Sequence, residues 1–403
     1  LAANVDFAGD FKNMNFVKPI MLSDTAMYKQ LDIPSMTLGG HVAYAPNNAD
    51  ASMALRMDNG DFVMQGVWDG RAKVYSAEIE LDSFPLQAIM PMSGLKDITV
   101  KAQAKGSGYD IYDLNTKLDA SIILDRLTYD NKLYSDVRAI AQLENGYMSL
   151  DVGSKNSNCA MDMTLSCMLN KDYYEFGVDG VVSNLDLKAM SLSETVSKGK
   201  GKIAAYGTID LENDAYEADL NLKDFDWVLP DARYSTPAVV VSVASSRDSM
   251  SVYAYEEDLF VNFNTPVSLD TLMARVSKCQ EIIDYEVNNK YLDVDTLQQT
   301  LPPMVCELRI GRNNLVQQAL KSYGIKMKNM SMDLVNDSTI YMKGRAQRLE
   351  AFNMKIDTLD MLVSQRNKYL SYNVHAGSRP GTNDEFANVT LKGGVRGNAL
   401  GML

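Results

Sequence analysis

The chain has 403 residues, a formal net charge of -13 and 46% hydrophobic residues. This length is ample for a large core, and the negative charge argues against nucleic acid and anionic membrane surfaces as partners. No apolar run approaches the roughly 20 residues that a membrane-spanning helix needs. The chain starts at Leu1 without a signal peptide or a lipid-attachment cysteine, so we expect a piece of a longer protein whose anchor lies outside it.

In the first part of the chain, residues 1–48 show a mixed pattern and are expected to form a lead-in. The pattern of residues 49–265 predicts β-strands. In residues 159–169, Met161, Met163 and Leu165 alternate with Asp162 and Thr164. Successive side chains of a strand point to opposite faces, so this period of two gives one apolar and one polar face. Asn-Gly pairs at residues 59–60 and 145–146 predict hairpin turns.

The same alternation recurs along the chain and predicts a mainly β fold, a long curved antiparallel sheet that forms an open groove. Many of the 24 methionines fall on the apolar side of these strands, which indicates either a surface that accepts varied apolar shapes or ordinary core filling. We expect the groove to be lined by Met53, Leu55, Met57, Leu118, Ile122, Leu124, Met161, Met163, Leu165, Leu169, Tyr216, Leu220, Leu222, Met330, Met332, Leu334, Phe352, Met354 and Ile356.

Over residues 266–324 the pattern changes to helical spacing. We expect the helices of this interlude to lie near residues 268–322. From the expected N-cap Ser268, an apolar stripe follows a period of 3.6, and we expect it to pack on the sheet or to close an end of the groove. Shorter helices are expected at residues 293–301 and 314–321. The β pattern returns over residues 325–403, where the groove continues. The expected stripe is Leu272, Val276, Cys279 and Ile283.

No catalytic, metal or cofactor motif is found, so the sequence predicts that the chain is not an enzyme. His41 and His375 are isolated, and a GxGxxA match at residues 199–204 opens a β run instead of a helix. Cys159 and Cys167 lie on one strand face about 26 Å apart, too far for a disulfide. Four reduced thiols are the favoured interpretation of the cysteines.

Two features resemble the TamB/AsmA group of Gram-negative envelope proteins. One is the repetition of apolar strands, Asn-Gly turns and short Leu-x-Ala-Ile/Met crossovers at residues 86–89 and 187–190. The other is the stretch YNVHAGSRPGTNDEFANVTLKGG at residues 372–394, which is similar to a segment of Bacteroides-type TamB proteins. The resemblance implies an inner-membrane anchor, a periplasmic β-taco with an apolar interior, a TamA-like outer-membrane barrel as partner, and phospholipid transport in support of outer-membrane assembly.

Physical reasoning supports such a groove, because a one-sided sheet must bury its apolar face on another sheet, on itself or on a ligand. The leading hypothesis is therefore a segment of a lipid conduit that binds acyl chains. The alternative is a structural or adhesive β-sandwich array with a dry core. A carbohydrate-binding or hydrolytic protein is the third possibility, and only Trp68 and Trp227 are available to stack on sugars.

Overall fold

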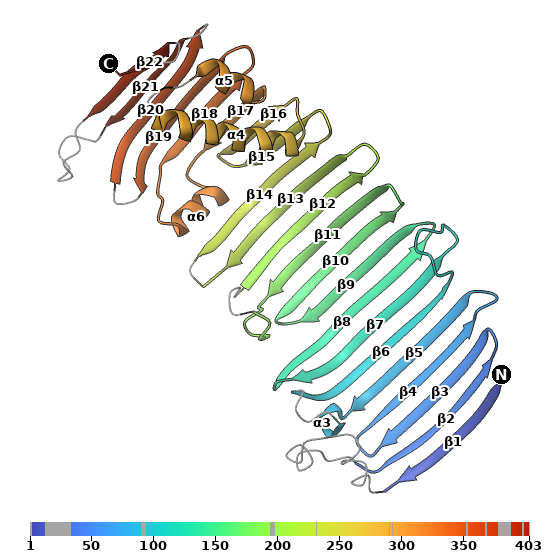
Figure 1. Ribbon diagram of the computed structural model, residues 1–403. Helices are drawn as coiled ribbons and strands as arrows, with labels where there is room; N and C mark the ends of the chain where they lie inside the picture. Colours follow the sequence, from blue (N-terminus) through green and yellow to red (C-terminus); the bar gives the residue numbers. More distant parts are fainter. Residues whose placement is uncertain are drawn as a thin grey trace. The chain divides into compact units, whose positions relative to one another are not determined.

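The computed structural model describes residues 2–12, 34–89, 94–193, 198–230, 232–289, 291, 293–351, 354–366, 369–377, 388–396 and 399–402. The chain forms two compact units, residues 1–194 (unit 1) and 195–403 (unit 2), which are coloured blue to green and green to red in Figure 1. The predicted mainly β fold is confirmed. Within each unit, every strand pairs antiparallel with the next strand along the chain, and the sheet is not closed into a barrel.

Unit 1 is an eleven-strand meander in which the only described helix, α3, follows β5. The single-turn helix α3 spans Leu86–Ile89. The strands are β1 Ala3–Phe11, β2 Met36–Ala45, β3 Asn48–Met57, β4 Gly60–Asp69, β5 Val74–Phe84, β6 Leu95–Ser107, β7 Lys117–Tyr129, β8 Lys132–Glu144, β9 Tyr147–Asn156, β10 Cys159–Leu169 and β11 Tyr173–Leu185.

Unit 2 combines a second meander with three helices. The helices are α4 Leu269–Asn288, α5 Val294–Thr300 and α6 Leu315–Ser322. The strands are β12 Lys198–Asp210, β13 Ala215–Val228, β14 Arg233–Ser245, β15 Met250–Glu256, β16 Leu259–Thr265, β17 Met304–Ile310, β18 Asn329–Asn336, β19 Ile340–Ala351, β20 Met354–Arg366, β21 Tyr369–Gly377, β22 Val389–Arg396 and β23 Ala399–Met402.

Local sequence signals explain most of these boundaries. Both predicted hairpins form, β3–β4 and β8–β9. The β3–β4 loop consists of Asp58 and Asn59, with Gly60 already in β4 opposite Met57, whereas Asn145 and Gly146 form the β8–β9 loop with φ angles of 55° and 74°, as a tight hairpin turn requires. The predicted helix starts are also confirmed. The Ser268 hydroxyl accepts a hydrogen bond from the Thr271 N–H at 3.3 Å, and Asp293 caps α5 in the same manner.

β-Bulges keep the apolar face continuous where the alternation is interrupted. Ser83 on β5 has a φ of 49°, and the β5–β6 register shifts between Leu81 and Phe84. A bulge adds one residue to one strand and therefore re-aims the side chains that follow. Phe84 thus returns to the side of Leu81, where it is 5% exposed and its ring lies 6.1 Å from that of Phe62.

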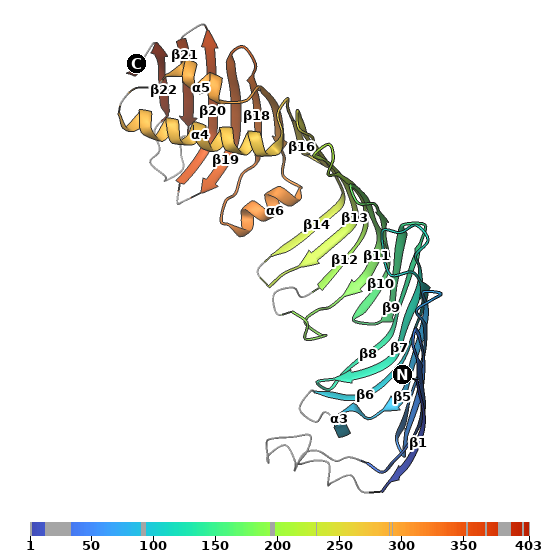
Figure 2. The same ribbon diagram turned by 45° about the vertical axis from the view of Figure 1, so that its right-hand side comes forward.

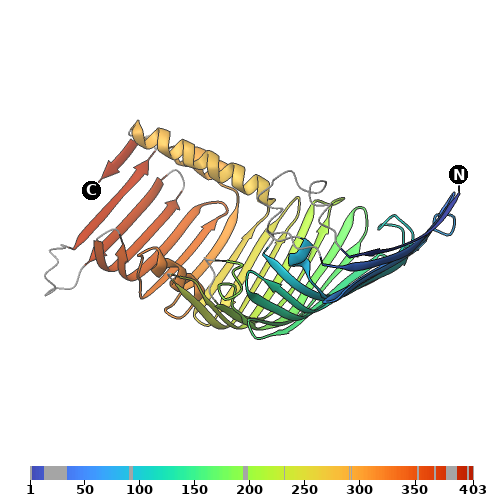
Figure 3. The ribbon, with the colours of Figure 1, turned by 90° about the horizontal axis from the view of Figure 1, so that it is seen from below.

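Helix α4 crosses the ends of several unit 2 strands (Figures 1 and 2) and lies along one rim of that sheet (Figure 3). The predicted burial of its stripe is half correct. Leu272 and Cys279 are buried, whereas Val276 and Ile283 are each 42% exposed. The reason is that α4 packs sideways on α5, where the Cys279 thiol approaches the Leu297 carbonyl oxygen at 3.9 Å, so only one edge of the stripe is covered.

The predicted domain limits differ from the observed units. The lead-in over residues 1–48 contains β1 and β2, and the helical interlude over residues 266–324 contains β17. The boundary between units follows residue 194, inside the segment that was expected to be one groove domain. Among the described residues, none of the helices combines the length and the apolar character needed to cross a membrane.

Candidate functional site

In unit 1, the strand register aligns apolar side chains into rows that cross all eleven strands. Residues directly opposite each other on neighbouring strands share a face, so each chain of pairings defines a row. The row through Met163 is Phe7, Gly40, Met53, Met64, Ile79, Ala102, Ile122, Ala139, Val152, Met163 and Gly180. No member of this row is polar.

The next row along the strands contains six consecutive small residues. Because strands lie about 4.8 Å apart, these six span roughly 24 Å across the sheet. The flanking rows contain larger side chains, among them Met64, Ile79 and Ile122 on one side and Trp68, Tyr75 and Leu118 on the other. The six are Ala51, Gly66, Ala77, Ala104, Ala120 and Ala141.

Unit 2 repeats the arrangement with different residues. One row crosses twelve strands without a polar side chain except the phenol of Tyr372. It consists of Gly207, Ala218, Val243, Val252, Phe263, Cys306, Leu334, Met342, Val363, Tyr372, Gly393 and Met402. The neighbouring row passes through Leu220 and Met332.

The structure places most of the predicted lining residues in these rows or in the rows beside them. Phe352 lies outside the described residues, and Met354 lies on β20 without a described side chain. Ile356 is opposite Leu349 of β19, beyond the left-handed residue Arg348. The residues found on the common apolar face of unit 1 are Met53, Leu55, Met57, Leu118, Ile122, Leu124, Met161, Met163, Leu165 and Leu169. Those on the apolar face of unit 2 are Tyr216, Leu220, Leu222, Met330, Met332 and Leu334.

The apolar face of each unit is substantially open to solvent. Ile122 is 52% exposed, Tyr216 48% and Leu165 38%. Within each unit, the strand pairings of the described residues form a single layer; α3 and α6 pack against β6 and β14, and α4 lies along one rim of the unit 2 sheet (Figure 3). Exposed apolar areas of this extent mark surfaces that bind another molecule.

The opposite face of unit 1 carries paired polar side chains. Glu78 accepts hydrogen bonds from Gln65 at 2.6 Å and from Lys101 at 2.8 Å, and the Lys101 bond followed by the Gln65 bond lowers the pKa of Glu78. On β10, Thr164 donates to Asp151 at 2.7 Å. A hollow of about 880 Å³ is lined by Gln65, Glu78 and neighbouring residues of β3 to β8. Carboxylates held ionised in this way are poor general acids.

Among its described residues, unit 2 contains two buried carboxyl groups that the sequence did not reveal, Glu256 on β15 and Glu286 on α4, and Glu286 accepts a hydrogen bond from the Asp293 N–H at 2.8 Å. Glu256 is 1% exposed and lies opposite Leu259 on the apolar face. Burial raises the pKa of Glu256, and this effect outweighs the hydrogen bonds from the Leu315 N–H and the Thr236 side chain, which lower the pKa. In the sequence, residues 256–258 read as an acidic turn, and only the tertiary contact with α6 distinguishes Glu256 from its neighbours.

The described residues contain no group of three or more histidine, cysteine or acidic side chains that could hold a metal ion. His41 pairs with Asp6 at 2.6 Å and His375 with Thr390 at 2.9 Å, both across neighbouring strands. All four cysteines are free; Cys159 and Cys279 are buried, whereas the other two are half-buried. The histidines therefore belong to the polar strand faces.

Two features of the molecule thus stand out, the apolar rows and the buried contact between Glu256 and α6. Both depend on residues far apart in the sequence, so they are properties of the register and not of a local motif. No protein-family model, curated protein or solved structure matches the chain.

Proposed function

We propose that the chain is a segment of a lipid conduit that holds phospholipid acyl chains on the apolar faces of its units. The observation that carries the proposal is the apolar row that crosses every strand of unit 1 and is left open by the described residues. An acyl chain gains about 0.8 kcal/mol for each CH₂ group that it buries. A continuous apolar floor therefore suffices, and no specific polar site is required.

The wider setting follows from the resemblance to the TamB/AsmA group. In that setting the chain belongs to a longer, inner-membrane-anchored protein in the periplasm. It would pass phospholipids between the two membranes, with a TamA-like outer-membrane barrel as partner and without catalysis. The competing proposal is a structural or adhesive β-sandwich, in which a second protein layer covers the same apolar rows and keeps them dry.

Two neighbouring positions on β10 separate the proposals. Met163 lies in the apolar row between Val152 and Gly180, whereas Thr164 points to the polar face and binds Asp151. A photo-crosslinking residue, p-benzoylphenylalanine, is placed at position 163 or at position 164, and cells are irradiated. Adducts are identified by mass spectrometry.

The conduit predicts lipid adducts at position 163 and none at position 164. The position 164 variant is the matched control, because it exposes the same probe one residue away on the other face. Protein adducts at position 163, or no adduct at either position in a chain that folds normally, would favour the dry-core sandwich.

A further inference from the structure

Four short strands leave a notch in the sheet of unit 2. β15, β16 and β17 have seven residues each and β18 has eight, between β14 with thirteen and β19 with twelve. β15 therefore pairs only with residues 240–245 of β14. Among the described residues, no strand pairs with residues 233–239 of β14 on that side, and such an edge exposes main-chain hydrogen-bonding groups.

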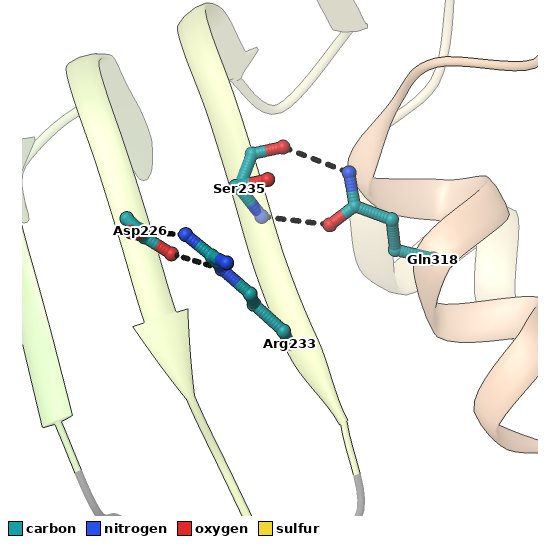
Figure 4. A network of polar contacts seen from close by, with 4 residues as sticks. All are labelled: Asp226, Arg233, Ser235 and Gln318. Carbon is teal, nitrogen blue, oxygen red and sulfur yellow. Dashed lines mark hydrogen bonds and ion pairs between the residues drawn. The ribbon is translucent and has the colours of Figure 1, made fainter.

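Helix α6 fills this notch. The Gln318 side chain accepts a hydrogen bond from the Ser235 N–H and donates one to the Ser235 carbonyl oxygen, both at 2.7 Å (Figure 4). Pro237, in the same stretch, has no N–H group to satisfy. On the other side of β14, Arg233 donates two hydrogen bonds of 2.7 Å to Asp226 of β13. A helix side chain thus takes the place of a missing strand.

Buried polar contacts fix the position of α6. Both Glu256 carboxylate oxygens accept from the Leu315 N–H at 3.0 Å. Asp258 accepts from the Asn314 side chain at 2.7 Å and from the main chain of residues 312 and 313. The Asn314 side chain in turn caps the helix by accepting from the Gln317 N–H at 2.8 Å. These bonds join the start of α6 to the β15–β16 turn.

An apolar pocket of about 620 Å³ lies between α6 and the β13–β14 hairpin, and it is called the α6 pocket below. The rings of Phe225 and Trp227 stack in it, with centroids 5.9 Å apart. The hydroxyl of Tyr234 is already bonded to Ser322 at 3.3 Å. No charged side chain lines the pocket, whose residues are Phe225, Trp227, Leu229, Tyr234, Leu315, Val316 and Ala319.

The α6 pocket adjoins the apolar rows of unit 2. Asp224 has a φ of 51°, and the β12–β13 register shifts between Lys200 and Lys202. This bulge turns Phe225 and Trp227 back to the face of Leu222. Trp227 then lies across Gly199, where an added Cβ would come within 2.6 Å of the indole. The apolar face therefore continues from the open rows into the α6 pocket, where α6 forms a second apolar wall.

We propose that the α6 pocket binds the end of a single aliphatic chain and so retains an acyl chain that lies on the apolar face. The inference rests on the proposed function, because that face supplies the chain. A chain in the pocket buries its CH₂ groups against the sheet on one side and α6 on the other, whereas the open rows cover only one side. A sugar would find few hydrogen-bond partners there, because the only polar side-chain groups of the lining are the Trp227 indole N–H and the Tyr234 hydroxyl. An added β-strand would find the Ser235 main chain already occupied by Gln318.

The two tryptophans allow a direct test, because each lies on the apolar face of a different unit. Trp227 lines the α6 pocket, and Trp68 lies on the open face of unit 1, 37% exposed. Two single-tryptophan variants, Trp68→Phe and Trp227→Phe, are titrated with 9,10-dibromostearic acid, whose bromine atoms quench indole fluorescence on contact. We expect saturable quenching of Trp227 by at least half, with unbrominated stearic acid competing.

A pocket-filling variant locates the bound chain. Ala319→Phe in the Trp68→Phe background should weaken the quenching of Trp227 at least fivefold, and Ala319→Leu serves if the phenylalanine variant does not fold. The control is Lys321→Phe, which adds the same ring at an exposed position on the other side of α6. This control should quench like its parent.

The outcomes separate the two proposals. Quenching of Trp68 without quenching of Trp227 overturns the α6 pocket and leaves the proposed function in place. Quenching of Trp227 that Ala319→Phe does not weaken also overturns the α6 pocket, because the chain then lies on the open face. Quenching of neither tryptophan overturns the proposed function, and the α6 pocket with it.

Discussion

The two units present similar apolar rows but maintain their sheets in different ways. In unit 1, strands of nine to thirteen residues pair along their length, and turns and bulges are sufficient to keep neighbouring strands in register. In unit 2, the four neighbouring strands β15 to β18 are short, and α6 with its buried polar contacts occupies the gap that they leave. Among the described residues of unit 1 no charged side chain is buried, whereas the notch of unit 2 is held by the contacts of Glu256 and Asp258 with the start of α6. The same difference provides unit 2 with a pocket.

The largest effect is expected on α4, which belongs to unit 2 alone. Leu272→Asp removes about 1.5–3 kcal/mol of apolar burial and places an unpaired carboxylate in a buried position, for a total of about 3 kcal/mol or more. For a unit of this size the Tm should fall by roughly 6–12 °C. The matched control is Val276→Asp on the exposed side of the same helix, for which we expect little change. Thermal unfolding followed by circular dichroism checks both, and equal losses would mean that α4 is buried on both sides.

A smaller effect is expected at the anchor of α6. Glu256→Ala leaves the Leu315 N–H without its partner, at about 1–3 kcal/mol for a buried group left unsatisfied, whereas the Thr236 hydroxyl keeps the Ala238 carbonyl oxygen as acceptor. Hydrogen exchange should accelerate over residues 315–322 and remain unchanged in unit 1. Glu257→Ala alters the exposed neighbour and serves as the control. Unchanged exchange in the Glu256 variant would show that α6 is held by its apolar contacts.

The sequence predicted what depends on near neighbours along the chain. The alternation around Met163, the hairpins at the Asn-Gly pairs and the starts of all three unit 2 helices were correct, because turn chemistry, caps and period are local. The apolar face could be predicted residue by residue for the same reason.

What the sequence could not show depends on packing between distant segments. The split of the α4 stripe follows from the sideways contact with α5, and the burial of Glu256 follows from the position of α6, about sixty residues further on. The row of six small residues was also missed, because it becomes visible only when six strands are aligned in register. Its members are ordinary alanines and a glycine in the linear sequence.

Removing the helix clamp on the strand edge should have a modest effect. Gln318→Ala deletes two hydrogen bonds to Ser235, and the expected loss is about 1 kcal/mol because water replaces the partner at an accessible edge. The exchange of the Ser235 amide should accelerate while the amides of residues 241–245, which β15 covers, stay protected. Lys321→Ala, on the same helix, is the control. A loss as large as that of Glu256→Ala would place the main anchor at the edge and not at the helix start.

The smallest effect is a dependence on pH that differs between the units. Burial raises the pKa of Glu256 above its ordinary value of 4.5, so its charge destabilises the docked α6 above that raised pKa, and the penalty disappears as the pH falls to 4.5. For Asp258, burial acts to raise the pKa, but hydrogen bonds from Asn314 and the neighbouring main chain outweigh it and lower the pKa below 3.8. Its contribution is therefore lost only as the pH falls below 3.8.

Protection of α6 should rise from neutral pH to pH 4.5 and then decline. In unit 1, Glu78 has a lowered pKa through its bonds to Lys101 and Gln65, so protection near it should only decline on acidification. Glu256→Gln should abolish the rise and keep the decline. Hydrogen exchange corrected for the intrinsic rate at each pH checks this, and a steady decline from neutral pH in the unaltered chain would contradict the penalty assigned to Glu256.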